Sequence, residues 1–337
     1  MTTFPCHEYD PEIGRRVAEL NGKPADSRSI ADYEALGAPL GRVESWDLDV
    51  KDRTIPGPGP EIPVRVYRPS GPAPAPRPCL VWLHGGAWVG GDLDMPEAHE
   101  TARGITGRAD AVVVSVDYRL CSDQVHFPAP HDDVVAAYRW VRDNAGDLGI
   151  DPDRIAVGGA SAGGNLAAGA ALRLRDEGET PWQALLLYPL VHAPIPAPSD
   201  ELAAALTQVP GPLLMVNEQL DMVSGLMLGG DPIESASVYV FPGHAEDLTG
   251  FPPTYIDNDE FDSLRSSGEL FTEQLRAAGV DVEQVLSVGV LHGHLNIVGL
   301  DAAHTTLDRM AARLLRAEAV TSTMHHDTTT PWRREDQ

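Results

Sequence analysis

Residues Ile155–Gly169 have the sequence IAVGGASAGGNLAAG and decide the fold of this chain. The apolar start of the stretch predicts a buried strand, and its Ala- and Leu-rich end predicts a helix. Between them lies the pattern G-x-S-x-G, centred on Ser161. In a strand–turn–helix setting this pattern presents a serine nucleophile, and its glycines let the helix pack back on the strand. A glycine-rich turn with an incidental serine is the alternative, so the rest of the chain must decide.

Strands and helices alternate on both sides of this stretch. Apolar runs predict buried strands, helical spacing predicts helices between them, and two alternating segments around a Pro/Gly turn predict an antiparallel pair before them. The expected strands are 43–50, 62–68, 79–83, 111–116, 184–188, 254–257 and 283–288, and the expected helices include 132–144, 262–278 and 301–317. This order predicts an α/β protein with a mostly parallel, doubly wound sheet.

Two segments do not follow the alternation. Residues 1–40 are polar with short helical patterns, and residues 190–235 combine a Pro- and Ala-rich stretch at 189–212 with a Leu/Met-rich helix at 213–228. We expect a catalytic domain formed by 41–189 and 236–318, with 1–40 and 190–235 outside the sheet as a helical cap. The polar residues 319–337 are expected to form a flexible tail.

The charge of the chain excludes some partners. Lys and Arg number 25 against 50 Asp and Glu, which gives a formal net charge of −25 over 337 residues. Nucleic acids and anionic membranes would be repelled, so we expect neither as a partner. Cys6, Cys79 and Cys121 match neither a disulfide framework nor a zinc pattern. With no signal peptide and no membrane-spanning run visible, the expected location is cytoplasmic.

A serine nucleophile needs a base, an acid to orient the base, and donors for the oxyanion. The loop His84-Gly85-Gly86-Ala87-Trp88 directly follows a predicted buried strand, so its N–H groups can point into the site. Late in the chain, His292 and His294 compete for the role of base in a loop after the 283–288 strand.

The acid is expected after the 254–257 strand. Four carboxylates lie there, and residue chemistry alone does not separate them: Asp257, Asp259, Glu260 and Asp262. Asp262 is also the best N-cap candidate for the next helix.

Together these motifs resemble the hormone-sensitive-lipase-like branch of the α/β-hydrolases, the bacterial family IV carboxylesterases. The matching stretches occur in the family's order: His84–Trp88, Asp117–Leu120, Phe127–Ala129 with Asp132 and Asp133, Gly159–Ala167, Phe261–Arg265 and His292-Gly293. The resemblance implies an α/β-hydrolase fold with a helical cap and a triad of Ser161, Asp262 and His292. It also implies oxyanion donors at Gly85, Gly86 and Ala162, and no metal or organic cofactor.

The chain departs from the family pattern at several places. Ala160 replaces an Asp, Ala87 replaces the third Gly, Cys121–Gln124 replaces Ala-Pro-Glu-His, and His294 replaces an aromatic residue. None of these removes a triad member. They indicate a less typical branch of the family.

The expected function is a serine carboxylesterase acting on a small-molecule ester through an acyl-enzyme. Because the cap is short, short acyl groups from acetyl to butyryl are expected, with Trp88, His294 and Met215 in the substrate pocket. Two alternatives stay open: an arylformamidase-like or other amide or lactone hydrolase with the same triad, and a non-catalytic small-ligand receptor on this fold. The sequence is also compatible with a homodimer.

Overall fold

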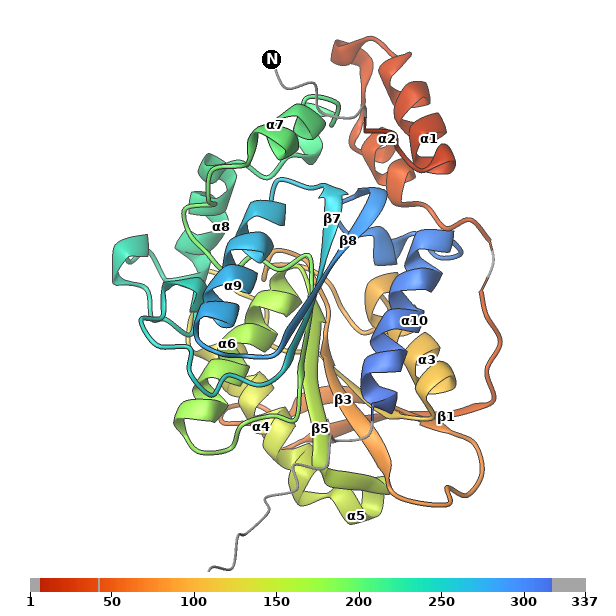
Figure 1. Ribbon diagram of the computed structural model, residues 1–337, viewed down its shortest axis with the longest axis vertical. Helices are drawn as coiled ribbons and strands as arrows, with labels where there is room; N and C mark the ends of the chain where they lie inside the picture. Colours follow the sequence, from red (N-terminus) through yellow and green to blue (C-terminus); the bar gives the residue numbers. More distant parts are fainter. Residues whose placement is uncertain (1–6, 42, 317–337) are drawn as a thin grey trace, which may run out of the picture.

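An eight-stranded sheet runs through the part of the chain that the structure, a computed structural model, describes: residues 7–41 and 43–316 (Figure 1). The strand order is β1-β2-β4-β3-β5-β6-β7-β8. The strands are β1 (Leu48–Ile55), β2 (Ile62–Pro69), β3 (Arg77–Leu83), β4 (Val112–Val116), β5 (Ile150–Ala160), β6 (Ala184–Leu187), β7 (Thr254–Phe261) and β8 (Val282–Leu291).

The pairing confirms the predicted topology. β1 and β2 are antiparallel, β2 is antiparallel to β4, and each pair from β4 onward is parallel. The residues of β4 and β6 are all buried, which explains why these strands are almost entirely apolar in the sequence. The fold is the α/β-hydrolase fold, with a mostly parallel sheet between two layers of helices.

The helices lie on both faces of the sheet (Figure 1). One core contains apolar residues of α4 and α6, with α9 and α8, and the other contains residues of α3, α10 and α1. The helices are α1 (Pro11–Asn21), α2 (Ile30–Glu34), α3 (Pro96–Ala109), α4 (Ala129–Asp143), α5 (Ala145–Leu148), α6 (Ala162–Asp176), α7 (Asp200–Leu206), α8 (Asn217–Met227), α9 (Arg265–Ala277) and α10 (Asp301–Leu315).

The segment 190–235 is more ordered than its composition suggested. The Pro-rich part contains the helix α7, which the sequence analysis did not predict, while α8 lies where a helix was expected. The Ser199 side chain accepts the Leu202 N–H at 3.1 Å, and Asp200 and Glu201 occupy the first turn. This N-cap and these charges stabilise a short helix despite the flanking prolines.

The N-terminal segment 7–41 lies beside the ends of β7 and β8 and near α7 (Figure 1). The Asp10 N–H donates to the Gly289 carbonyl at 2.8 Å, and the Tyr9 hydroxyl donates to the Gln208 carbonyl at 2.9 Å. The two segments outside the sheet therefore meet each other at the same edge. The expected tail, 319–337, lies outside the described residues.

Within the described residues, no helix has the length and apolar character needed to cross a bilayer.

Candidate active site

Ser161 lies at the sharp turn between β5 and α6. Its backbone has φ 54° and ψ −118°, a region that non-glycine residues rarely adopt. A β-carbon at Gly159 would collide with the Gly163 carbonyl, and one at Gly163 would collide with the Leu83 carbonyl. The strand–turn–helix setting and the need for both glycines are thus as predicted.

Three side chains from distant parts of the sequence form a continuous hydrogen-bond chain. His292 Nε2 lies 2.9 Å from Ser161 Oγ, and His292 Nδ1 lies 2.7 Å from Asp262 Oδ2. The other Asp262 oxygen accepts the Leu264 N–H at 2.9 Å, which orients the carboxylate in the turn before α9. Asp262 is only 2 % exposed, whereas 31 % of the His292 side chain is exposed. The imidazole can therefore reach both Ser161 and a bound ligand.

Opposing effects act on the basicity of His292. Burial lowers the pKa of the imidazole, but the Asp262 carboxylate, with Asp259 and Glu97 behind it, outweighs burial and raises the pKa to about 9. The charge of Asp262 thus makes the ring a stronger base than a free histidine.

The other three acid candidates lie within β7 and contact other partners. Asp259 lies 2.6 Å from His294 Nδ1, and Asp257 accepts the hydroxyls of Tyr255 and Ser287. Glu260 accepts the Gly289 N–H with one oxygen. Of the four candidates, Asp262 alone is within hydrogen-bond distance of the His292 ring.

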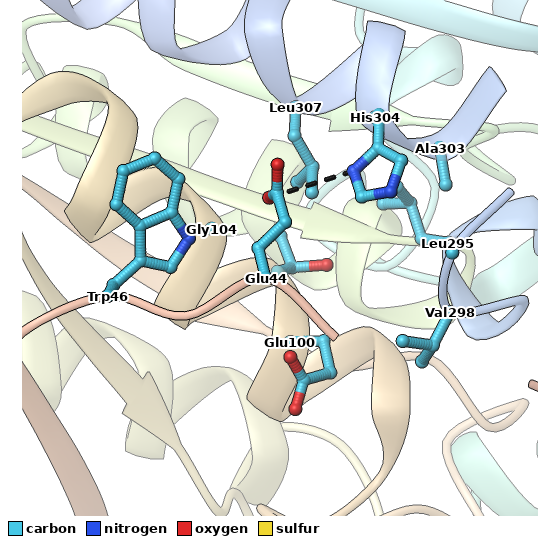
Figure 2. Close-up of a pocket in the computed structure, with 11 residues that line it drawn as sticks. Glu44, Trp46, Glu100, Gly104, Leu295, Val298, Ala303, His304 and Leu307 are labelled. Carbon is cyan, nitrogen blue, oxygen red and sulfur yellow. Dashed lines mark ion pairs between the residues drawn. The ribbon is translucent and has the colours of Figure 1, made fainter. Parts of the chain in front are cut away.

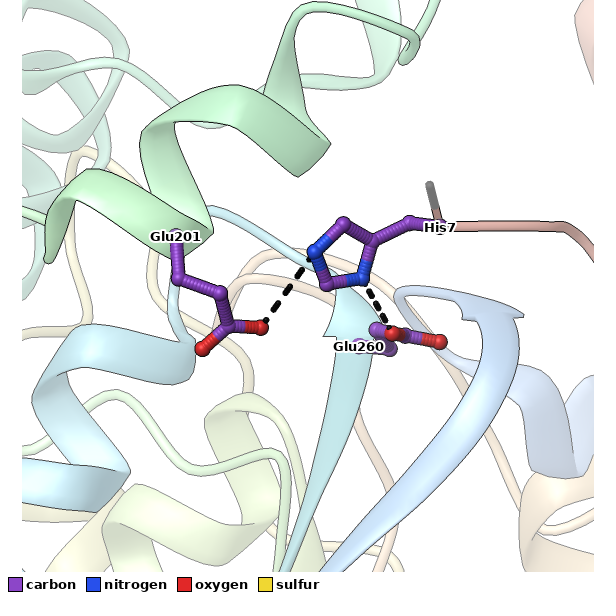
Figure 3. A group of neighbouring side chains, drawn as sticks. All are labelled: His7, Glu201 and Glu260. Carbon is purple, nitrogen blue, oxygen red and sulfur yellow. Dashed lines mark hydrogen bonds and ion pairs between the residues drawn. The ribbon is translucent and has the colours of Figure 1, made fainter. Parts of the chain in front are cut away.

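Figure 3 shows that the second oxygen of Glu260 contacts His7 of the N-terminal segment. His7 lies between two carboxylates, with Nδ1 2.6 Å from Glu260 and Nε2 3.5 Å from Glu201 of α7. Arg265 also donates to both Glu201 oxygens, at 3.3 and 3.1 Å. Since Arg265 and His7 already contact these carboxylates, the cluster fits a structural link between the N-terminal segment and α7 better than a metal site.

The loop after β3 differs in one respect from the expected oxyanion site. The Gly85 N–H donates to the buried Glu97 carboxylate at 2.6 Å, so it does not point at a ligand as expected. Among the described residues, the N–H groups of Gly86 and Ala87 have no such partner. Ala162 is the first residue of α6, where the N–H lacks an intrahelical acceptor. The arrangement therefore favours Gly86, Ala87 and Ala162 over Gly85.

Glu97 and its partners carried no signal in the sequence. The Glu97 carboxylate also accepts the Tyr188 hydroxyl at 2.7 Å and the Asn296 amide at 3.2 Å. Through these hydrogen bonds Glu97 connects the loop after β3 with the residue after β6 and with the turn after His292. A single Glu in the first turn of a helix is common, and only the packing of three distant segments gives it this position.

A cavity of about 270 Å³ lies against His292, between the N-terminal segment and the segment 190–235. Its apolar lining comes from both segments, from the ends of β7 and β8 and from the turn after His292: Leu36, Leu213, Phe261, Leu291 and Ile297. Tyr33, Glu34 and Asn296 are the side chains with polar groups that line it beside His292.

None of the three expected pocket residues lines this cavity. Trp88 is 1 % exposed, donates to Asn165 at 3.2 Å and packs edge-on against Phe241. His294 is fully buried between Asp259 and Thr306. Met215 packs against the hydrophobic core on the α6 side. Trp88 and His294 are close in sequence to site residues and yet buried, because nearby residues can point to opposite sides of the backbone.

A second pocket lies between α3, α10 and the segment before β1, where His304 Nδ1 lies 3.6 Å from a Glu44 carboxylate oxygen (Figure 2). Its volume of about 30 Å³ is close to that of one water molecule in the liquid, so it is too small for an ester substrate.

The comparisons with known proteins identify the family. Residues 80–296 match the family model described as alpha/beta hydrolase fold. The chain is 39 % identical over 280 residues to carboxylesterase NlhH of Mycobacterium tuberculosis, covering 80 % of this chain and 83 % of that one. The match to esterase LipI of the same species is 36 % over 260 residues, covering 77 % and 79 %.

A solved structure gives the same result. The hyperthermophilic esterase from Pyrobaculum calidifontis superposes with a TM-score of 0.72 at 32 % identity, over 91 % of this chain and 98 % of that one. The chain therefore belongs to the α/β-hydrolase family, in its hormone-sensitive-lipase-like branch, the bacterial family IV carboxylesterases.

Proposed function

We propose that this carboxylesterase hydrolyses short-acyl esters through an acyl-enzyme formed on Ser161. The observation that carries the proposal is the chain of hydrogen bonds from Asp262 through His292 to Ser161, with distances of 2.7 and 2.9 Å. In this order each group has the partner that serine catalysis needs.

In the proposed reaction, His292 Nε2 takes the Ser161 proton while Oγ attacks the ester carbonyl carbon. Asp262 stabilises the imidazolium that forms. The N–H groups of Gly86, Ala87 and Ala162 bind the developing oxyanion, helped by the positive end of α6. The imidazolium then protonates the leaving alkoxide, which departs as the alcohol. Water, deprotonated by His292, hydrolyses the acyl-enzyme and releases the acid. No step needs a metal or organic cofactor.

The size of the cavity supports short acyl groups. At about 270 Å³ it is smaller than pockets for drug-sized ligands, which are roughly 300–1,000 Å³. The segments 1–40 and 190–235 supply Leu36 and Leu213 to its wall, so we assign both to a cap over the site. We expect a space of this size beside His292 to take acetyl to butyryl chains better than a long lipid chain.

A chain-length series of p-nitrophenyl esters tests the proposal. We expect kcat/KM to be highest between acetyl and butyryl and to fall for longer chains. Leu213→Ala, which shortens a cavity-lining side chain, should move the optimum to longer acyl groups. Met222→Ala in the same segment is the matched control, because Met222 is 67 % exposed and does not line the cavity. A kcat/KM that climbs steadily into long chains in the unmodified enzyme would contradict the small pocket.

An arylformamidase-like amidase uses the same groups, so substrate chemistry must separate the two. We expect turnover of phenyl acetate to exceed that of N-formyl aniline at equal concentration. The reverse preference would assign the chain to the amide hydrolases. Cytoplasmic location and a homodimer stay predictions, the second to be measured by light scattering.

A further inference from the structure

A second Asp–His pair lies beside the first and has no part in the proposed reaction. Asp259 Oδ1 lies 2.6 Å from His294 Nδ1, and both side chains are fully buried. The other Asp259 oxygen accepts the N–H of Gly293 at 3.0 Å. Gly293 is the residue between the two histidines, so the pair holds the loop that carries His292.

Each histidine faces a hydroxyl with its second nitrogen. His292 Nε2 lies 2.9 Å from Ser161 Oγ, and His294 Nε2 lies 2.9 Å from Thr306 Oγ1 of α10. Within the described residues the Ser161 hydroxyl contacts no other hydrogen-bond partner, so its proton can point at His292. The two Asp–His pairs are therefore alike in geometry. The difference between them is the acceptor of the Thr306 proton.

The Thr306 hydroxyl has a carboxylate beside it. Thr306 Oγ1 lies 3.2 Å from Asp257 Oδ2, which also accepts the Tyr255 hydroxyl at 2.8 Å. Ser287 donates to Asp257 Oδ1 at 2.7 Å and lies 3.2 Å from Thr306 Oγ1. Thr306 is the donor in its contact with Asp257, and a hydroxyl has only one proton to donate. With the Thr306 proton on Asp257, His294 Nε2 has to be the donor in its contact with Thr306.

The first nitrogen of His294 is also a donor. Asp259 already accepts the Gly293 N–H, and hydrogen bonds to a carboxylate favour its ionised form. His294 Nδ1 then donates to Asp259 Oδ1, so both ring nitrogens carry a proton.

We propose that His294 is a buried imidazolium that, paired with Asp259, is a positioning residue for the loop of His292. The effect of His294 on catalysis rests on the proposed function of His292 as the base, whereas the protonation state of His294 does not depend on it. The pair is neutral as a whole, which lowers the cost of burying it. Because both His294 nitrogens are occupied as donors, the ring cannot compete with His292 for a proton from the substrate side.

The surrounding charges agree with a protonated ring. Burial lowers the pKa of His294, but Asp259 outweighs burial and, with Asp257 and Glu97, raises the pKa. Burial raises the pKa of Asp259 to about 6, so this carboxylate is ionised above that pH. The titratable and charged groups that face the pair come from β7, from the residues directly after β6, β7 and β8, and from α3 and α10: Asp257, Tyr255, Tyr188, Asp262, His292, Glu97 and Arg309.

Nitrogen NMR of the full chain, labelled at the histidine rings, tests the protonation state directly. We expect both ring nitrogens of His294 to remain protonated at about pH 8, where an ordinary histidine with a pKa of about 6.5 is neutral. His99, whose pKa is lowered by burial, gives the reference signal of a neutral ring in the same spectrum. One unprotonated nitrogen on His294 at this pH would overturn the proposal.

Thr306→Val tests the same point through the hydroxyl. The change keeps the shape of the side chain but removes the acceptor for Nε2–H, so His294 should lose that proton. Because a small misplacement of a reacting group can cost up to about 100-fold, we expect kcat to fall roughly 10-fold with KM unchanged. Thr305→Val is the matched control, since Thr305 is the exposed neighbour on the same helix. A protonated Nε2 in Thr306→Val, or equal kcat in both variants, would contradict the proposal.

The two proposals can fail separately. If Ser161→Ala retains activity, the proposed function is wrong, while the His294 signal still reports its protonation. If Ser161 is essential and His294 is neutral in the unmodified enzyme, only the present inference is wrong.

Discussion

Glu97 accepts the backbone N–H of Gly85 at 2.6 Å, and this contact links the loop beside Ser161 to the interior of the protein. The same carboxylate accepts the Tyr188 hydroxyl, and the Tyr188 ring packs edge-on against His292 with ring centres 5.1 Å apart. The buried Glu97 side chain is therefore in contact with Gly85 of the expected oxyanion loop and with Tyr188, which packs against the base His292. Its removal should affect catalysis without any contact to substrate.

The first prediction concerns Glu97. Glu97→Gln keeps the size but replaces one acceptor oxygen with a donor, so the amide cannot satisfy Gly85 and Tyr188 as well as the carboxylate does. We expect kcat to fall by roughly 10- to 100-fold, less than or near the loss for one oxyanion donor. Glu100→Gln, on the same helix and paired with Arg103, should leave kcat unchanged. Equal kcat in the two variants would show that Glu97 has no part in positioning the loop.

The second prediction concerns the nucleophile. Ser161→Ala should lower kcat by roughly 10⁴–10⁶ and abolish labelling by an organophosphonate, because no other group can form the acyl-enzyme. Ser235→Ala, at an exposed serine in the segment 190–235, should keep full activity and labelling. Mass spectrometry of the labelled protein identifies the modified residue. A phosphonate on any other serine would disprove the assignment.

The third prediction concerns the choice of acid. Asp262→Asn keeps the shape of the side chain but loses the charge that orients and stabilises protonated His292, so kcat should fall by about 10³–10⁴. The Leu264 N–H can still be accepted by the amide oxygen, and thermal unfolding should show a retained fold. Asp281→Asn, in an exposed position before β8, is the control. Nearly normal kcat in Asp262→Asn would mean that another carboxylate serves His292.

The fourth prediction concerns pH. The base must be neutral to accept the Ser161 proton, and the pKa of His292 is raised to about 9. Below that pH the ring is increasingly protonated, so kcat/KM for p-nitrophenyl acetate should rise with pH and reach half its plateau near pH 9. Asp262→Asn removes the charge that raises the pKa, so in that variant the midpoint should move to lower pH. An unchanged midpoint would show that the measured pKa belongs to a group other than His292.

The same shift has a consequence for stability. A histidine whose pKa is raised by folding stabilises the native state below its unfolded pKa of about 6.5, and this contribution is lost as pH rises through the folded pKa. The imidazolium–Asp262 contact should therefore add to stability under mildly acidic conditions and not above pH 9.

The sequence by itself determined the parts that depend on local pattern. Apolar runs predicted the buried strands β4 and β6, helical spacing predicted α4 and α10, and the glycines around Ser161 predicted the sharp turn between β5 and α6. These features follow from neighbours a few residues apart, because hydrophobic periodicity and turn geometry act over that range. Local pattern left four carboxylates and two histidines as equal candidates, and only the resemblance to a family chose Asp262 and His292.

Tertiary structure decided which of these groups meet. Asp262 and His292 come together from the ends of β7 and β8, and Ser161 reaches them from β5. His294, two residues from His292, points into the core instead of the cavity. The Gly85 N–H donates to the Glu97 carboxylate and is not available to a ligand. Such contacts join residues up to 131 positions apart, so they depend on how strands and helices pack and not on the residues around each side chain. The direction of a side chain after a strand is set by that packing, which no local pattern encodes.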